Sequence, residues 1–123
     1  MEASSTKLKK VLIVDDNEEI RHALKEALED NDFEVSTLKS GLELLGTLRT
    51  NNVPDVLILD IVMPGRTGID VLTTVRSVWP IVKIIIHSGH GEYRSSIPSQ
   101  FIDMFLEKPL PVEDIVKKVK ALV

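Results

Sequence analysis

The sequence predicts a single α/β domain built on a doubly wound, five-stranded parallel sheet with helices on both faces. The first observation is that residues 11–14 and 56–59 are continuously apolar, as in parallel strands that are buried on both faces. The second is that segments with apolar residues at helical spacing separate such runs. Strands that alternate with helices require right-handed crossovers, which place the helices against the two faces of one parallel sheet.

The first half of the chain contains three predicted strands and two predicted helices. The strand at 11–14 is followed by a helix between 17 and 31, in which apolar residues recur every three or four positions. A weakly alternating strand follows at 33–38, and residues 40–43 match a capping box that begins the second helix. An Asn- and Pro-containing breaker then leads into the third strand, 56–59.

The second half of the chain continues the alternation but is less regular. After a turn at 63–68, apolar residues at helical spacing predict a third helix, and strands follow at 83–86 and 101–106. A final helix is predicted after the two prolines that follow the last strand. The stretch 89–99 is polar, contains Pro98 and lacks a clean period, so we predict a loop with at most a short helix. The helix between the fourth and fifth strands is therefore expected to be short or irregular.

Length and composition limit the possible functions. A chain of 123 residues fits one domain, and we expect residues 1–6 to form a flexible leader and residues 7–123 the folded domain. A formal net charge of -4 argues against direct nucleic-acid binding through a basic face. With no cysteine there is neither a disulfide framework nor a thiolate metal site. The apolar runs are too short to span a bilayer and no signal core is visible, so we expect a cytoplasmic protein without membrane partners.

Polar side chains follow four of the predicted strands. Asp15 and Asp16 end the first strand, Asp60 the third, Ser88 the fourth and Lys108 the fifth. In open parallel sheets, ligands gather outside the carboxyl ends of the strands, so these side chains are expected to meet at one rim. Neighbouring carboxylates repel one another and need a cation, and all-oxygen ligation with room for water suits Mg²⁺. A lysine and a hydroxyl beside them provide the electrostatic stabilisation that phosphoryl transfer requires.

Each of these residues also has an ordinary structural interpretation. Asp15 and Asp16 are suited to capping the first helix, Ser88 to a turn and Lys108 to a solvated surface. A charge that ends a buried strand, as Asp60 does, is harder to explain without a partner. The joint placement of these residues at successive strand ends favours the functional interpretation. We interpret the nearby histidines, at 87 and 90, as surface polar groups rather than zinc ligands.

The chain resembles the receiver domain of two-component response regulators over nearly its full length. The matching motifs are the strand ending in two acids at 11–16, the run 57–64 with Gly68 beyond it, Ser88, and the Lys108-Pro109 pair. This resemblance implies a flavodoxin-like receiver fold in which Asp60 accepts a phosphoryl group. The domain would then be a signalling component rather than an enzyme, although it would assist its own phosphorylation and dephosphorylation.

The resemblance also implies a role for each site residue. Asp16, Asp60 and the main-chain carbonyl of Val62 would bind Mg²⁺ directly, and Asp15 would support the metal through water. Lys108 would pair with the phosphate, and its peptide bond with Pro109 would be cis. Ser88 would reorient to hydrogen-bond the phosphoryl oxygens. Phe105 lies where the family has a switch aromatic, whose ring turns inward when that hydroxyl moves.

The implied partners are a sensor histidine kinase or phosphotransfer protein as donor, and a partner protein or an absent output domain as target. The segment between Ser88 and Lys108 is about two residues shorter than is usual in the family, which leaves the output surface open to remodelling. A pseudo-receiver that acts as a phosphorylation-independent interaction module is the alternative. A haloacid-dehalogenase-type phosphatase would need an acid at position 62, where this chain has Val62. A flavodoxin-like binding module would need a phosphate-cradling loop after the first strand, where Asp15 and Asp16 would repel phosphate.

Overall fold

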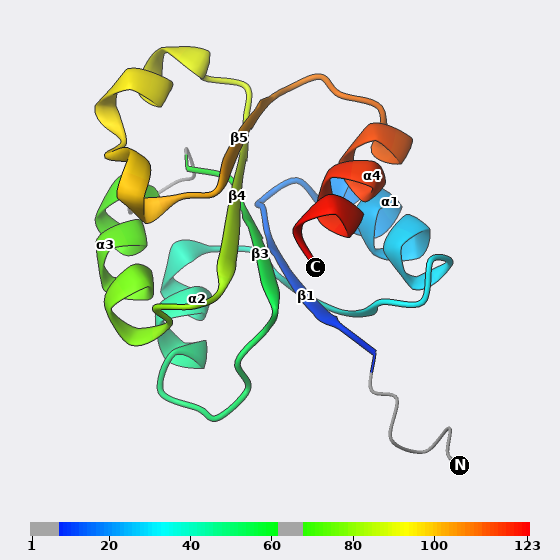
Figure 1. Ribbon diagram of the computed structural model, residues 1–123, viewed down its shortest axis with the longest axis horizontal. Helices are drawn as coiled ribbons and strands as arrows, with labels where there is room; N and C mark the ends of the chain where they lie inside the picture. The colour runs from blue at the N-terminus through cyan, green and yellow to red at the C-terminus, as the bar shows by residue number, and fades with distance from the viewer. Residues whose placement is uncertain (1–7, 62–67) are drawn as a thin grey trace.

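The computed structural model of the chain describes residues 8–61 and 68–123, with the side chains of residues 68 and 69 excepted. Its centre is one five-stranded sheet in the order β2-β1-β3-β4-β5, in which every neighbouring pair is parallel. The predicted architecture is therefore confirmed (Figure 1). The strands are β1 (Lys10–Val14), β2 (Glu34–Leu38), β3 (Val56–Leu59), β4 (Lys83–Ser88) and β5 (Met104–Glu107).

Helices cover both faces of this sheet. Helices α1 (Glu18–Glu29) and α4 (Val112–Leu122) lie side by side on one face, and α2 (Gly41–Thr47) and α3 (Gly68–Val78) lie on the other (Figure 1). The chain runs from β1 outward to β2 and then returns past β1 to β3. The strand order thus reverses between β1 and β3, and the carboxyl ends of these two strands flank the crevice where such folds bind ligands.

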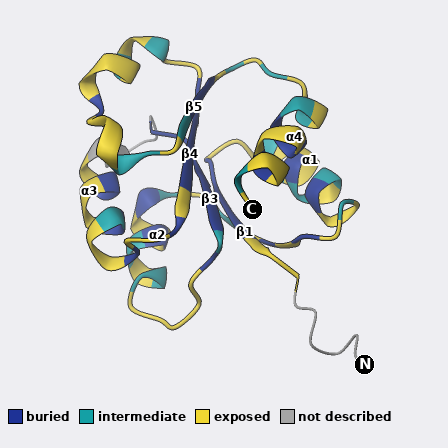
Figure 2. Cartoon of the chain, viewed as in Figure 1, coloured by how far each residue is buried: buried dark blue, intermediate teal, exposed yellow. Residues whose placement is uncertain are grey.

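The strands divide their side chains between two hydrophobic cores. Along β1, Val11 and Ile13 pack beneath α1 and α4, whereas Leu12 and Val14 pack against α2 and α3. All four residues are at most 5% exposed. Burial of an aliphatic side chain contributes about 1.5–3 kcal/mol, which explains why a continuous apolar run is needed at the centre of this sheet. Figure 2 shows β1, β3 and β4 buried along most of their length and the helices buried on their inner sides only.

The predicted capping box at the start of α2 is present. The hydroxyl of Ser40 accepts a hydrogen bond from the main-chain N–H of Glu43, at 3.1 Å. The carboxylate of Glu43 accepts one in return from the main-chain N–H of Lys39, at 2.7 Å. The first contact satisfies a main-chain donor that the helix start leaves without a partner, and the second satisfies the donor of the residue before the N-cap.

The segment between β4 and β5 contains two short 3-10 helices, η2 (Gly91–Ser96) and η3 (Ser99–Phe101), in place of a regular helix. The prediction of an irregular segment is confirmed. The predicted start of the fifth strand at residue 101 was wrong, because β5 begins at Met104. Phe101 instead ends η3.

The guanidinium of Arg76, near the end of α3, holds this irregular segment in place. It donates hydrogen bonds to the carbonyl of Phe101 at 3.1 and 2.9 Å and to the carbonyl of Val82 at 2.8 Å. It also lies 3.4 Å from the carboxylate of Asp103, which itself accepts a bond from the main-chain N–H of Ile84 at 2.7 Å. One arginine therefore ties α3, the start of β4 and the approach to β5 together.

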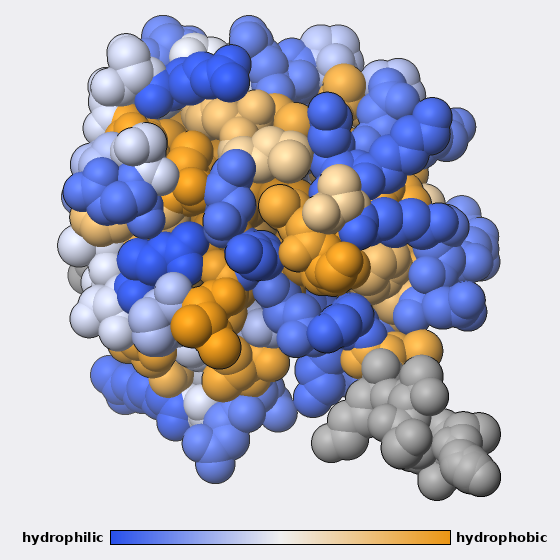
Figure 3. Space-filling model, viewed as in Figure 1, coloured by the Kyte–Doolittle hydropathy of each residue, from blue (hydrophilic) through white to orange (hydrophobic). Residues whose placement is uncertain are grey.

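On the face seen in Figure 3, polar and charged residues form most of the periphery, and apolar residues show between them in the middle. Among residues 8–61 and 68–123, no helix is both long enough and apolar enough to cross a membrane.

Candidate functional site

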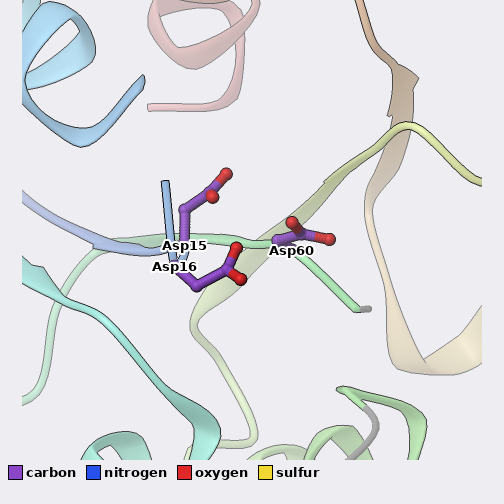
Figure 4. A group of neighbouring side chains, drawn as sticks. All are labelled: Asp15, Asp16 and Asp60. Atoms are coloured by element: carbon purple, nitrogen blue, oxygen red, sulfur yellow. The ribbon is translucent and has the colours of Figure 1, made fainter. Parts of the chain in front are cut away.

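The structure brings Asp15, Asp16 and Asp60 together at the crevice between β1 and β3. Asp15 and Asp16 directly follow β1, and Asp60 directly follows β3 (Figure 4). The main-chain N–H of Asp60 donates to the carbonyl of Val14 at 2.9 Å, which extends the pairing of the two strands to their ends. One carboxylate oxygen from each of the three acids lies within 4.8 Å of the others.

These three carboxylates differ in their access to solvent. Asp15 is 2% exposed and Asp60 is 6% exposed, whereas Asp16 lies on the surface. A buried carboxylate is costly unless a cation or hydrogen-bond donors compensate its charge. Oxygen donors that converge in this way, with one side open to water, fit a small hard cation that keeps part of its water shell.

Capping of α1 does not account for the two acids after β1. The N-cap of α1 is Asn17, whose side-chain oxygen accepts from the main-chain N–H of Ile20 at 3.0 Å. Asp15 uses one carboxylate oxygen to accept from the N–H of Asn17, at 2.9 Å. Its other carboxylate oxygen points to the lysine described next.

Lys108 bridges two of the acids from the end of β5. Its side-chain nitrogen Nζ lies 2.9 Å from Oδ2 of Asp15 and 3.1 Å from Oδ2 of Asp60. Burial alone lowers the pKa of Lys108, but the hydrogen bonds and charges of the two carboxylates outweigh it, so the pKa lies above its ordinary value. The lysine is therefore charged at neutral pH. Its peptide bond with Pro109 is cis, as predicted.

Ser88 ends β4 and is fully buried. Its hydroxyl oxygen accepts a hydrogen bond from the main-chain N–H of His90 at 3.0 Å, and its carbonyl accepts from the N–H of Lys108 at 2.7 Å. The serine and the lysine are thus joined through the main chain at the rim that carries the acids.

Phe105 is 8% exposed and packs into the core formed with α2 and α3. The guanidinium carbon of Arg94, in η2, lies 5.6 Å from the centre of its ring, a distance at which a cation is attracted to an aromatic face. The remaining predicted site residue, Val62, lies outside the residues that the structure describes.

His87 is the residue of this region that the sequence interpretation missed. It is only 4% exposed, so its assignment as a surface polar group was wrong, whereas the side chain of His90 is 50% exposed. Burial, followed by the charge of Lys108, lowers the pKa of His87 to about 4 against a smaller opposing effect of Asp15. The burial of His87 could have been predicted from its position directly after the apolar residues 84–86, because the buried strand β4 continues through it.

A doubly wound parallel sheet with three carboxylates and a lysine at its switch point defines a class of α/β domains whose rim could hold a metal ion. Comparison with known proteins identifies the family within that class. The family model described as the response regulator receiver domain matches residues 11–120. The chain therefore belongs to the response regulator receiver domain family.

Individual relatives agree with this assignment. The transcriptional regulatory protein PrrA of Mycobacterium tuberculosis is 34% identical over 119 residues, which cover 92% of this chain and 49% of PrrA. The response regulator TrrA of Thermotoga maritima, solved in complex with Mg²⁺-BeF, has a TM-score of 0.85 and 35% identity over 94% of this chain and 100% of that chain. TrrA in complex with the histidine kinase ThkA gives a TM-score of 0.82 and 34% identity, covering 94% of this chain and 99% of that chain.

The curated relatives are longer than this chain. It spans about half the length of PrrA and of the response regulator MprA of Mycobacterium sp. strain KMS, which is 28% identical over 92% of this chain. The activities of those whole proteins also depend on parts that this chain does not cover. They are therefore not properties of this domain.

Proposed function

We propose that this domain accepts a phosphoryl group on the carboxylate of Asp60 from a phosphohistidine donor. The observation that carries the proposal is the position of Asp60, within 4.8 Å of two other carboxylates and 3.1 Å from the ammonium of Lys108. The complex of the related TrrA with Mg²⁺-BeF supports it, as does the family assignment. In the transfer, a carboxylate oxygen of Asp60 forms a bond to phosphorus while the bond from phosphorus to the histidine nitrogen breaks, and its electron pair stays on the imidazole.

Mg²⁺ fits the oxygen donors of this site. Asp16, Asp60 and the main-chain carbonyl of Val62 would hold it, with Asp15 acting through water, and it would neutralise negative charge on the phosphoryl oxygens. Lys108 binds a phosphoryl oxygen with the ammonium that bridges Asp15 and Asp60 in this structure. The ammonium of Lys108 thereby moves from the carboxylates to the phosphoryl group, which carries the new negative charge.

A conformational response follows from the same contacts. The hydroxyl of Ser88, now an acceptor from the N–H of His90, turns to donate a hydrogen bond to the phosphoryl group. Its movement changes the packing around Phe105, whose ring lies beneath Arg94 in this structure. The phosphorylated Asp60 carries roughly two negative charges in place of one, and Ser88 and Phe105 bias a two-state equilibrium toward the form that binds a partner.

We infer that the donor is a sensor histidine kinase or a phosphotransfer protein, which the complex of TrrA with the kinase ThkA supports. The target is a partner protein or an output domain outside this chain, without direct nucleic-acid contact by the receiver itself. In this proposal residues 7–123 form the receiver, and the protein acts in the cytoplasm.

Incubation with acetyl phosphate and Mg²⁺, followed by intact-mass measurement, tests the proposal. The wild type is expected to gain the mass of one phosphoryl group, and Asp60→Asn is expected to gain none. Asp32→Asn, which changes an acid outside the site, serves as the matched control and should be labelled like the wild type. If the wild type is not labelled and shows no Mg²⁺-dependent spectral change with beryllofluoride, the pseudo-receiver alternative replaces the proposal.

A further inference from the structure

The turn that leads from β1 into α1 is held through every polar group of Asp15. Its main-chain N–H donates to the carbonyl of Leu38 at 3.1 Å, and its two carboxylate oxygens accept the bonds described above. Its carbonyl accepts a hydrogen bond from Nη1 of Arg21, in the first turn of α1, at 2.7 Å. Arg21 is thus bonded to the peptide group that joins Asp15 to Asp16.

Asp16 has no comparable contacts. Its side chain lies on the surface, and among residues 8–61 and 68–123 no hydrogen bond or ion pair reaches its carboxylate. One of its carboxylate oxygens nevertheless lies within 4.8 Å of an oxygen of Asp15 and of Asp60. The main chain must therefore set the position of Asp16. The bond from Arg21 to the preceding carbonyl holds that main chain.

The place of Arg21 in its helix runs against the usual preference for charge. The start of an α-helix carries partial positive charge, so acids stabilise it and cations destabilise it. Helix α1 follows this rule with Glu18 and Glu19, yet Arg21 comes only two positions later. Helical side chains lean toward the N-terminus, which allows the guanidinium to reach the carbonyl six positions earlier. Hydrogen bonds from a charged donor are among the strong ones, so this contact offsets the unfavourable position.

We propose that Arg21 is a positioning residue for the metal site. Its guanidinium fixes the peptide between Asp15 and Asp16 and thereby holds the carboxylate of Asp16 toward that of Asp60. The inference rests on the proposed function, because it concerns the Mg²⁺ that would assist phosphoryl transfer to Asp60. Groups that orient metal ligands commonly change the affinity for the metal by roughly 10- to 100-fold, although they do not bind it themselves.

The charge of Arg21 taken alone predicts the opposite effect on metal binding. A cation near three carboxylates repels a divalent cation, so removal of its charge would tighten Mg²⁺ binding. Loss of positioning weakens binding instead, because a freer Asp16 must be ordered when the metal binds. The direction of the change in Mg²⁺ affinity therefore separates the two roles.

NMR titration of the isotopically labelled protein with Mg²⁺ measures that affinity, through the main-chain N–H signals of Asp16 and Asn17. Arg21→Met is expected to raise the Mg²⁺ concentration at half-saturation roughly tenfold. Arg21→Lys keeps a charged donor and is expected to raise it less than about threefold. Lys25→Met is the matched control, since it removes the same charge one turn further along α1 from a side chain without a hydrogen bond to the described residues. It should bind Mg²⁺ at least as tightly as the wild type.

Labelling of Asp60 with acetyl phosphate gives a second readout. For Arg21→Met, the Mg²⁺ concentration that gives the half-maximal labelling rate is expected to rise by the same factor as in the titration. The rate at saturating Mg²⁺ should stay within about twofold of the wild type, because the variant loses metal binding and not the reacting groups. An arginine that only stabilised the fold would change urea unfolding and leave the Mg²⁺ affinity of the folded protein as it was.

The inference is overturned if Arg21→Met binds Mg²⁺ as tightly as the wild type, or more tightly, while the wild type responds to Mg²⁺ as expected. Arg21→Ala places a strong helix former at this partly buried position and provides the same comparison if the methionine variant does not fold. If the wild type itself shows no saturable Mg²⁺-dependent shifts, the proposed function and this inference fail together.

Discussion

The side-chain nitrogen of Lys108 lies 3.1 Å from a carboxylate oxygen of Asp60, although 48 positions separate the two residues in the chain. The same nitrogen lies 2.9 Å from Asp15. Two carboxylates that are almost fully buried thus share one ammonium, whose own pKa they raise. The lysine acts as a resident counter-charge in a site whose donor set also suits a divalent cation.

Removal of that counter-charge is expected to make stability depend on Mg²⁺. Lys108→Met leaves buried carboxylates without their ammonium, and we expect the free energy of unfolding to fall by about 2 kcal/mol in metal-free buffer, as for the loss of a charge-assisted hydrogen bond. Saturating Mg²⁺ should restore more stability to the variant than it adds to the wild type. Urea unfolding with and without Mg²⁺ measures both effects, and equal losses in the two buffers would contradict the expectation.

Acid should destabilise the fold through His87. Above pH 6.5 this histidine is neutral in the folded and unfolded chains. Below that pH the unfolded chain binds a proton that the folded chain excludes until about pH 4, so the free energy of unfolding falls as the pH falls. The contribution is about 3 kcal/mol across this window. Urea unfolding at a series of pH values between 7 and 4 measures it.

The variants His87→Leu and His22→Leu isolate this effect, since carboxylates titrate in the same region. His87→Leu is expected to flatten the decline in stability between pH 6.5 and 4. His22 lies on the exposed surface of α1, and its replacement should leave the decline as in the wild type. A decline of equal steepness in all three proteins would show that His87 does not cause it.

Loss of the Arg76 guanidinium is expected to loosen the approach to β5 selectively. Arg76→Met removes the donors to the carbonyls of Phe101 and Val82, and we expect a loss of about 2 kcal/mol because bonds from a charged donor contribute most. Hydrogen exchange should accelerate between residues 97 and 105 more than in β1. Arg49→Met, at an exposed position, should change stability by less than about 0.5 kcal/mol.

Loss of the N-cap of α2 is expected to have a smaller effect on stability, confined to that helix. Ser40→Ala removes the oxygen that accepts from the N–H of Glu43, and should lower the free energy of unfolding by about 1 kcal/mol. Ser40→Asp keeps an acceptor at the same position and should lose little. Thermal unfolding of the two variants provides the comparison, and equal losses would mean that the cap contributes nothing.

The sequence predicted the features that depend on neighbouring residues. The apolar runs could be assigned to β1 and β3 because a continuous apolar segment that ends in an acid fits a buried parallel strand and few other structures. The cap of α2 could be assigned because Ser40 and Glu43 form a local motif. The convergence of Asp15, Asp60 and Lys108 could be predicted because parallel strands bring their carboxyl ends to one edge. Local pattern and sheet topology were sufficient for most of the candidate site.

Features set by distant contacts were not predictable in this way. Phe101 and Ile102 are as apolar as a strand, yet Phe101 ends η3, where its carbonyl accepts from Arg76, 25 positions earlier in the chain. The burial of His87 likewise depends on α1 and α4, which cover its strand from two remote parts of the sequence. Periodicity carries no information about such partners.

The shared ammonium of Lys108 has a consequence for biosynthesis. Asp15 and Asp60 are synthesised before β5 and Lys108, and β5 pairs with β4 at the edge of the sheet. A nascent chain that contains only β1 to β4 would have to bury two acids without this cation. We therefore expect chains stalled before residue 108 to leave the β1–β3 rim open, and the compact rim to close only when the last strand is added.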